Sequence, residues 1–140
     1  MKFKEAQGGY IIRLFKGEKI METLHSFCKS ENIKFASIDA IGGASDITLG
    51  YYNLETKEYS WREFSEIHEI VSLEGNVSLV EGEPFIHLHS VISNQNFETF
   101  GGHLKEATVG ATCEVFLRNL NIPLTRKMDE EIGLKLLDLE

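Results

Sequence analysis

The chain has 140 residues, of which 42% are hydrophobic and 26% are charged. A chain of this length can bury a core large enough to fold without disulfide or metal staples, so we expect residues 1–140 to form a single domain. The formal net charge is −8 and no cluster of basic side chains occurs, which argues against the phosphate neutralisation on which affinity for nucleic acid largely depends.

The amino terminus and the two cysteines indicate the cellular compartment. Residues 1–5 contain no apolar run like that of a signal peptide, and no segment approaches the roughly 18 apolar residues of a membrane span. Cys28 and Cys113 each occupy an apolar position of the local pattern, so we expect buried free thiols rather than a disulfide. Together these features predict a cytoplasmic protein with no membrane segment.

Hydrophobic periodicity predicts one helix and then a run of strands. Residues 10–15 form the first predicted strand, and apolar residues between Glu18 and Glu31 recur at the spacing of an amphipathic helix. A second strand, residues 33–41, is expected to end at Gly42-Gly43. Further strands are predicted at residues 47–52, 59–64, 67–73, 77–80, 85–92 and 107–117, separated by turn residues such as Glu74-Gly75-Asn76. The pattern predicts an α+β fold with a mixed, largely antiparallel sheet and one main helix near the N-terminus.

Three histidines are the most chemically suggestive feature of the sequence. His87 and His89 share one face of the predicted strand at residues 85–92, because side chains alternate along a strand. His103 follows Gly101-Gly102, a predicted tight turn that can fold it back over the same face. Three imidazoles around an open fourth position are a known zinc arrangement. We therefore predict that His87, His89 and His103 bind zinc or another divalent transition metal.

The alternative interpretation of any histidine is an ordinary core or surface residue. We keep this alternative open for the three histidines above. For His25, on the predicted helix, and for His68 it is the preferred interpretation, and we expect both side chains at the surface.

Charged residues on apolar strand faces are the candidates for catalysis. Glu69 shares a face with Ile67 and Val71, and Arg13 shares one with Ile11. A buried charge needs a partner, so Glu69 and Arg13 can neutralise each other, or Glu69 can serve the histidine site as a base or an orienting group. The third possibility is that either strand lies at an edge and its charge is solvated.

Glu114 is a second carboxylate candidate. It lies opposite the apolar face of the predicted strand at residues 107–117. The alternative for Glu114 is simple exposure to solvent.

Six ordered segments resemble a known family. They are Arg13-Leu14 with Gly17-Glu18, Ala40-Ile41-Gly42-Gly43-Ala44, Glu69 to Asn76, His87-Leu88-His89, Gly101-Gly102-His103-Leu104, and Thr112-Cys113-Glu114-Val115. In this order they resemble the plants-and-prokaryotes conserved (PPC) domain in its stand-alone prokaryotic form. The resemblance extends from Tyr10 to Leu117.

The resemblance implies a fold, an assembly and a metal. The family fold is an α+β domain that forms a homotrimer. Its histidine segments are associated with a bound metal, and zinc is the metal we expect. In this chain those segments correspond to His87, His89 and His103. Plant members follow an AT-hook in DNA-binding proteins, whereas this chain has no Arg-Gly-Arg core of such a hook.

The family also resembles, more distantly, acetolactate decarboxylase, in which three histidines hold zinc. That similarity implies a metal acting as a Lewis acid on an oxygen of a small anionic molecule, with Arg13 or another arginine holding the anion and Glu69 or Glu114 moving protons. Three functions remain open at this point. They are a metal-binding homotrimeric domain with a small-molecule ligand or substrate, a DNA-binding protein related to transcription, and a protein-interaction module with a structural metal.

Overall fold

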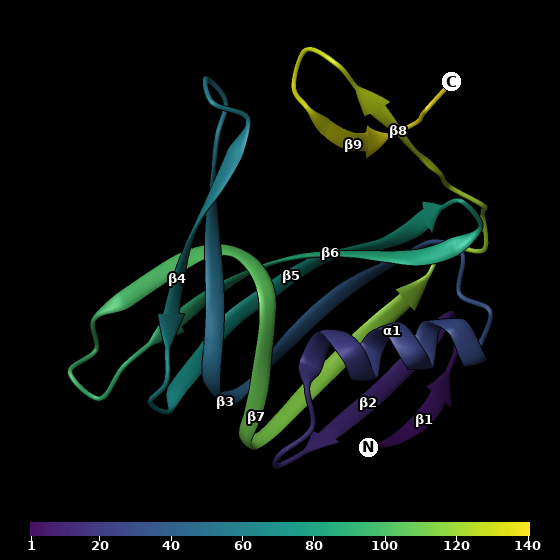
Figure 1. Ribbon diagram of the computed structural model, residues 1–140. Coiled ribbons are helices and arrows are strands. Elements are labelled where there is room, and N and C mark those ends of the chain that lie inside the picture. The colour runs from purple at the N-terminus through teal and green to yellow at the C-terminus, as the bar shows by residue number, and fades with distance from the viewer.

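The structure, a computed structural model that describes residues 1–140, contains nine strands and one helix (Figure 1). The elements in chain order are β1 (Lys2–Ala6), β2 (Gly9–Phe15), α1 (Ile20–Ser30), β3 (Ala36–Asn53), β4 (Glu58–Phe64), β5 (His68–Val80), β6 (Glu83–Ser93), β7 (Thr99–Asn119), β8 (Arg126–Asp129) and β9 (Leu134–Leu137). The predicted α+β class is therefore wrong. The fold is mainly β, because the helix has 11 residues and the strands take up most of the chain.

Two long strands hold the main sheet together. The strand order is β1-β2-β7-β6-β5-β3-β4, and β7 also pairs with β3, so the sheet curls back on itself (Figure 1). All these pairings are antiparallel. The second half of β7 pairs with β2, whereas its first half pairs with β6. This arrangement brings the end of β6 and the start of β7 next to the β3–β4 hairpin.

Three glycine-containing segments that we predicted as strand ends or turns lie inside continuous strands. Gly42-Gly43 lies within β3, Glu74-Gly75-Asn76 within β5 and Gly101-Gly102 within β7. Gly75 and Gly102 are needed for close backbone approach. A Cβ atom on Gly75 would overlap the carbonyl oxygen of His87, and one on Gly102 would lie 2.7 Å from the carbonyl oxygen of Gly50. Glycine here marks tight strand packing and not a change of direction.

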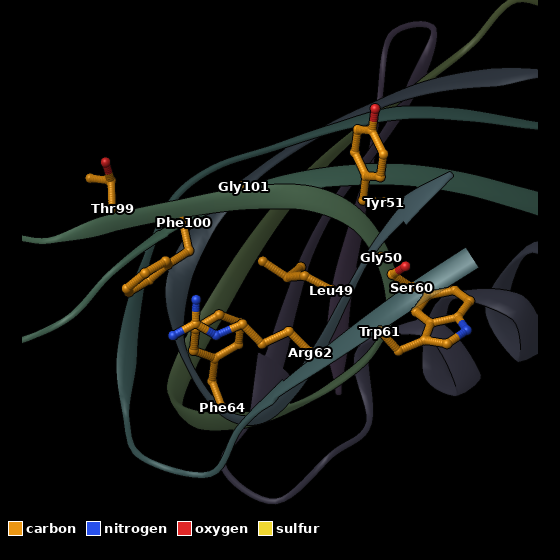
Figure 2. A pocket seen from close by; sticks show the side chains of 10 residues that line it. All are labelled: Leu49, Gly50, Tyr51, Ser60, Trp61, Arg62, Phe64, Thr99, Phe100 and Gly101. Carbon is orange, nitrogen blue, oxygen red and sulfur yellow. The ribbon is translucent and has the colours of Figure 1, made fainter. Parts of the chain in front are cut away.

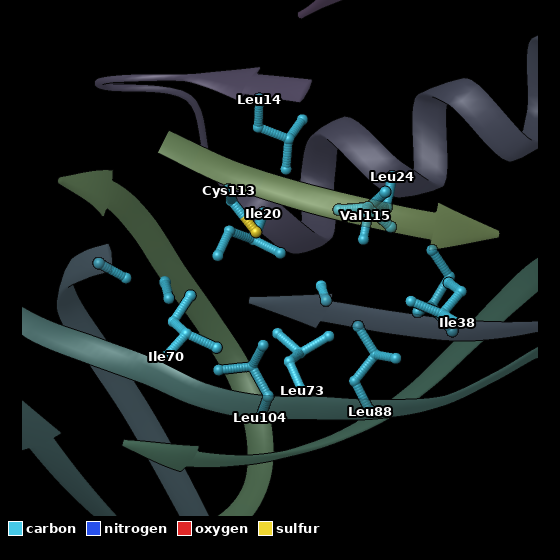
Figure 3. Packing of buried hydrophobic residues seen from close by; sticks show 14 of the residues in the cluster. Leu14, Ile20, Leu24, Ile38, Ile70, Leu73, Leu88, Leu104, Cys113 and Val115 are labelled. Atoms are coloured by element: carbon cyan, nitrogen blue, oxygen red, sulfur yellow. The ribbon is translucent and has the colours of Figure 1, made fainter. Parts of the chain in front are cut away.

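The core lies between the curled sheet and the helix. A single cluster of 26 buried hydrophobic residues fills it, and Figure 3 shows part of this packing. The buried face of α1 consists of Ile20, Leu24, Phe27 and Cys28, and it packs against β6 and β7. Both cysteines are buried and free, as predicted, and burial raises the pKa of each thiol to about 12.

A carboxylate from β7 orients the helix. The residue before α1, Lys19, makes no side-chain capping bond. Instead Glu106 accepts hydrogen bonds from the backbone N–H groups of Met21, at 2.9 Å, and Glu22, at 3.2 Å. These amides have no partner inside the helix, and a negative charge there also complements the helix dipole. The helix is therefore joined to the strand that carries His103.

The chain ends in a small hairpin that the sequence did not predict. Strands β8 and β9 pair with each other and form a separate two-stranded sheet. The hairpin contacts the main sheet at two places, where Arg126 meets β5 and β6 and where the Tyr52 hydroxyl donates to the carbonyl of Ile132 at 2.8 Å. The helix α1 is too short to cross a membrane.

Candidate metal centre

One row of residues in register crosses five strands and carries two of the histidines. Along this row Glu74 on β5 pairs with His89 on β6, and His89 pairs with His103 on β7. The row continues through Gly50 on β3 to Trp61 on β4. Residues directly opposite each other in a sheet point to the same face. The register therefore places His89 and His103 side by side, although 13 residues of chain separate them.

The third histidine joins the other two from the same strand as His89. The Nε2 atoms of His87 and His89 are 3.2 Å apart, in keeping with the prediction that residues two apart on a strand share a face. One potential ligand atom from each of the three side chains lies within 4.8 Å of the other two. The three imidazoles thus converge on one point, His87 and His103 half-buried and His89 exposed.

Aromatic rings from β4 lie beside His103, which also has an unpaired ring nitrogen. The Nδ1 atom of His103 is buried and has no hydrogen-bond partner within the chain. The ring of Tyr59 lies 5.2 Å from that of His103, and the ring of Trp61 lies 6.2 Å from it. Trp61 reaches this position because residue 50 is a glycine, since a Cβ atom there would lie 2.5 Å from the indole. A buried nitrogen without a partner is costly unless a ligand satisfies it.

The surroundings keep two of the imidazoles neutral. Burial, reinforced by the nearby charges of His103, Arg126 and His89, lowers the pKa of His87 to about 4. Burial and His89 also lower the pKa of His103. A histidine binds a metal only through an unprotonated nitrogen. At neutral pH these side chains therefore have the protonation state that a metal requires.

Arg126 from the C-terminal hairpin lies behind His87. Its guanidinium donates to Ser78 Oγ at 2.8 Å, to the Lys135 carbonyl at 2.8 Å and to Asn76 Oδ1 at 2.9 Å, with a longer contact of 3.4 Å to His87 Nδ1. The guanidinium therefore lies against Nδ1 of His87, while Nε2 of the same ring faces His89. Arg126 thus places a positive charge behind the His87 ring.

The donor set fits a zinc-like ion. Zinc binds histidine nitrogen at about 2.0–2.1 Å, so two nitrogens on one tetrahedral ion lie about 3.3 Å apart. The 3.2 Å separation between His87 and His89 agrees with that spacing. His103 offers a third donor, with one ring nitrogen within 4.8 Å of those of the other two histidines. Three nitrogen ligands leave one coordination position for water or a ligand.

The structure does not bring the predicted catalytic residues to the histidines. Glu69 is exposed and pairs in register with Gly43 and Ser93, four residues along β6 from His89. Arg13 and Glu114 are exposed and face each other across β2 and β7. The two ion pairs of the chain are Met1 with Glu18 and Lys29 with Glu83, so Glu69 and Arg13 do not neutralise each other.

Two residues near the centre were missed by the sequence reasoning. Glu74 was assigned to a turn, but it lies beside His89 and accepts a hydrogen bond from the Ser72 hydroxyl at 2.7 Å. An alternating pattern continued through residue 74 would have placed it on the outer face. Arg126 lies 39 residues from His87 in sequence, and nothing in the local pattern signals their contact.

The two remaining histidines differ from each other. His25 is exposed on α1, as predicted. His68 is buried, its Nδ1 lies 2.9 Å from the carbonyl oxygen of Glu66, and its ring packs against Phe64. The prediction of a surface position is wrong for His68, because β5 begins there and directs the side chain into the core.

The fold and the three histidines define a class: a mainly-β domain with a histidine cluster able to hold a metal. The sequence pattern of the Plants and Prokaryotes Conserved (PCC) domain matches residues 1–121. The chain belongs to this family, as the ordered segments had indicated. Residues 122–140, which include β8, β9 and Arg126, lie beyond the matched region.

Solved structures share the whole fold. A protein from Bacteroides thetaiotaomicron, described as a "putative dna binding protein", is 28% identical with a TM-score of 0.95, and the match covers 98% of this chain and 96% of that one. A "metal-containing protein" from Archaeoglobus fulgidus is 38% identical with a TM-score of 0.87, covering 96% of this chain and 95% of that one.

A curated relative is much longer than this chain. The bifunctional protein GlmU of Synechococcus sp. (strain JA-3-3Ab) is 28% identical over 134 residues, or 94% of this chain. The chain spans 20% of the length of that relative. The similarity therefore concerns one part of a larger protein.

Proposed function

We propose that this protein is a cytoplasmic, metal-binding homotrimer of one domain per chain, residues 1–140, which binds or acts on a small anionic molecule. His87, His89 and His103 hold the metal, with zinc the first choice among divalent transition metals. The observation that carries the proposal is the convergence of three imidazole nitrogens within 4.8 Å of one another. The description of the Archaeoglobus relative as metal-containing supports it.

The side chains around the centre suit an anionic ligand. A metal bound there supplies a Lewis acid that polarises an oxygen of the ligand. Arg126 adds a fixed positive charge beside His87. Glu74, in register with His89, is better placed to accept or donate a proton than Glu69 or Glu114.

An exposed apolar face supports the homotrimer. Several large apolar side chains of the main sheet are about half exposed on the side away from the core, namely Ile11, Ile41, Val71, Val91 and Phe116. Val91 lies two residues from His89 on β6 and so shares its face. Apolar patches of this kind mark interaction surfaces. Light scattering in solution should give three times the mass of the 15.9 kDa chain.

DNA binding is the second candidate, favoured by the description of the Bacteroides relative. The net charge of −8 opposes it, because a polyanion binds to clustered positive charge. The third candidate, an interaction module with a structural metal, differs in its coordination. A structural site is closed by four protein ligands, whereas three histidines leave one position open.

Metal analysis of matched variants tests the proposal. After loading with zinc and removal of the excess, His87→Ala and His89→Ala should retain much less metal than the wild type, while the circular dichroism spectrum stays unchanged. His25→Ala is the control, since His25 is exposed on α1 away from the centre, and it should retain the full amount. Retention of metal by both centre variants would place the ion elsewhere.

A further inference from the structure

A hollow lies over β3 between β4 and the start of β7, on the edge of the sheet that carries the β3–β4 hairpin. Its volume is about 450 Å³, within the range of about 300–1,000 Å³ typical of small-molecule sites. The residues around it are Leu49, Gly50, Tyr51, Ser60, Trp61, Arg62, Phe64, Thr99, Phe100 and Gly101 (Figure 2). We refer to this hollow as the Arg62 groove.

The apolar part of the Arg62 groove comes from the core. Leu49 and Phe64 are buried, and the ring of Phe100 lies 5.0 Å from that of Phe64. Trp61, 42% exposed, lines the groove on the side toward the histidines. These surfaces can cover the apolar or aromatic body of a small ligand.

Arg62 is the one charged residue that lines the groove. Its guanidinium lies 4.8 Å from the centre of the Phe64 ring and 4.7 Å from that of Phe100 (Figure 2). Stacking on two rings holds the charged group in place. The side chain takes part in neither of the two ion pairs of the chain and in no side-chain hydrogen bond. Its planar set of N–H donors is therefore free, and that geometry matches a carboxylate.

We propose that the Arg62 groove binds a small organic monocarboxylate with an apolar or aromatic body. The carboxylate accepts hydrogen bonds from the Arg62 guanidinium, and the body lies against Leu49, Phe100 and Trp61. We infer an anionic ligand because the groove contains one unpaired positive charge and no negative charge. The site is separate from the metal centre and does not rest on it, since none of the three histidines lines the groove.

The chain contains a built-in reporter for this site. Trp61 is the single tryptophan of the sequence, so intrinsic fluorescence senses occupation of the groove. We would titrate metal-free protein with benzoate and with benzamide, its neutral counterpart of similar shape, and measure affinity by calorimetry in parallel. Benzoate should saturate the fluorescence change, and benzamide should bind at least about tenfold more weakly because it lacks the charge-assisted contact.

Variants of the arginine locate the carboxylate. Arg62→Gln should reduce affinity for benzoate to that for benzamide, and Arg62→Lys should retain part of the preference because the charge remains. Arg118→Gln removes another exposed positive charge, at the far end of β7, and its affinity for benzoate should equal that of the wild type. The double variant His87→Ala/His89→Ala should also bind as the wild type does.

Several outcomes would overturn the assignment. Equal affinity for benzoate and benzamide, or no binding of either, would mean that the groove has no carboxylate site. Loss of benzoate binding in the double histidine variant would place the carboxylate at the metal centre. A change in solution mass for Arg62→Gln would mean that a second copy of the chain covers the groove. Failure of the metal proposal would leave the expected results here unchanged.

Discussion

His87 has the most constrained environment of any single side chain in the centre. It is half-buried, its Nδ1 faces the guanidinium of Arg126 and its Nε2 faces His89. Burial disfavours the imidazolium form most, and the charges of His103, Arg126 and His89 add to it, so the pKa of His87 falls to about 4. The same features that prepare this residue to bind a metal make its protonation costly to the fold.

The low pKa of His87 predicts a pH dependence of stability in the metal-free protein. The pKa is about 4 in the folded chain, against an ordinary value of 6.5. Between these values the unfolded chain binds more protons, so the free energy of unfolding should fall as pH is lowered from 6.5 toward 4. Urea unfolding across this range should show a weaker pH dependence in His87→Gln than in the wild type. The same pH dependence of the free energy of unfolding in both proteins would contradict this prediction. His25→Gln is the control and should behave as the wild type does.

The histidines could be predicted from the sequence, whereas their neighbours could not. The spacing of His87 and His89 places them on one strand face whatever the sheet around them. Arg126 reaches the centre only through the docking of a hairpin that follows the main sheet. Contacts of that kind depend on tertiary packing, which leaves no local periodic signal.

At the scale of elements, glycines decide how the strands meet. Gly75 and Gly102 each lie opposite a backbone oxygen of a neighbouring strand, next to His87 and His103 in the register. The prediction of turns at these glycines was wrong because a glycine in a sequence can indicate either a bend or a close approach. The strand boundaries were consequently too short, and the α+β class followed from the shortened strands.

Replacing Gly75 tests the close approach. Gly75→Ala should destabilise the protein by about 2–4 kcal/mol, because the added methyl group must displace the β6 backbone at His87. Gly101→Ala is the matched control, since a Cβ atom there meets its nearest neighbour at 3.5 Å, and it should cost much less. Chemical unfolding measures both. Equal costs would show that backbone contact at Gly75 does not limit the fold.

The helix offers a second test at this scale. Glu106→Ala should destabilise the protein by about 1–2 kcal/mol, because it leaves the amides of Met21 and Glu22 without their carboxylate partner. Glu22→Ala removes an exposed acidic residue from the same turn and should change stability by less than about 0.5 kcal/mol. Thermal unfolding compares the two variants. If Glu106→Ala costs no more than Glu22→Ala, the cap does not hold α1.

At the scale of the whole molecule, charge separates the candidate functions. With 14 basic and 22 acidic residues, the chain should not be retained by duplex DNA even at low salt. Retention on immobilised DNA, measured over a range of salt concentrations, tests this directly. Binding that weakens steeply as salt rises would instead support the DNA-binding alternative.

The C-terminal hairpin contributes to the surroundings of the metal centre. It lies beyond the region matched by the family pattern, yet it supplies Arg126 to the surroundings of His87. The main sheet thus carries the three histidines, and the additional segment adds the positive charge beside them. Members of the family with a different C-terminal segment would present a different environment to the same histidines.

The most direct test of the account is the metal content of the native protein. Untagged protein should be purified without chelators, and metal should be counted per chain by elemental analysis. The three-histidine centre predicts close to one zinc, or one other divalent transition metal, for each chain. Absence of metal, even after incubation with zinc, would contradict it and leave the three histidines as core and surface residues.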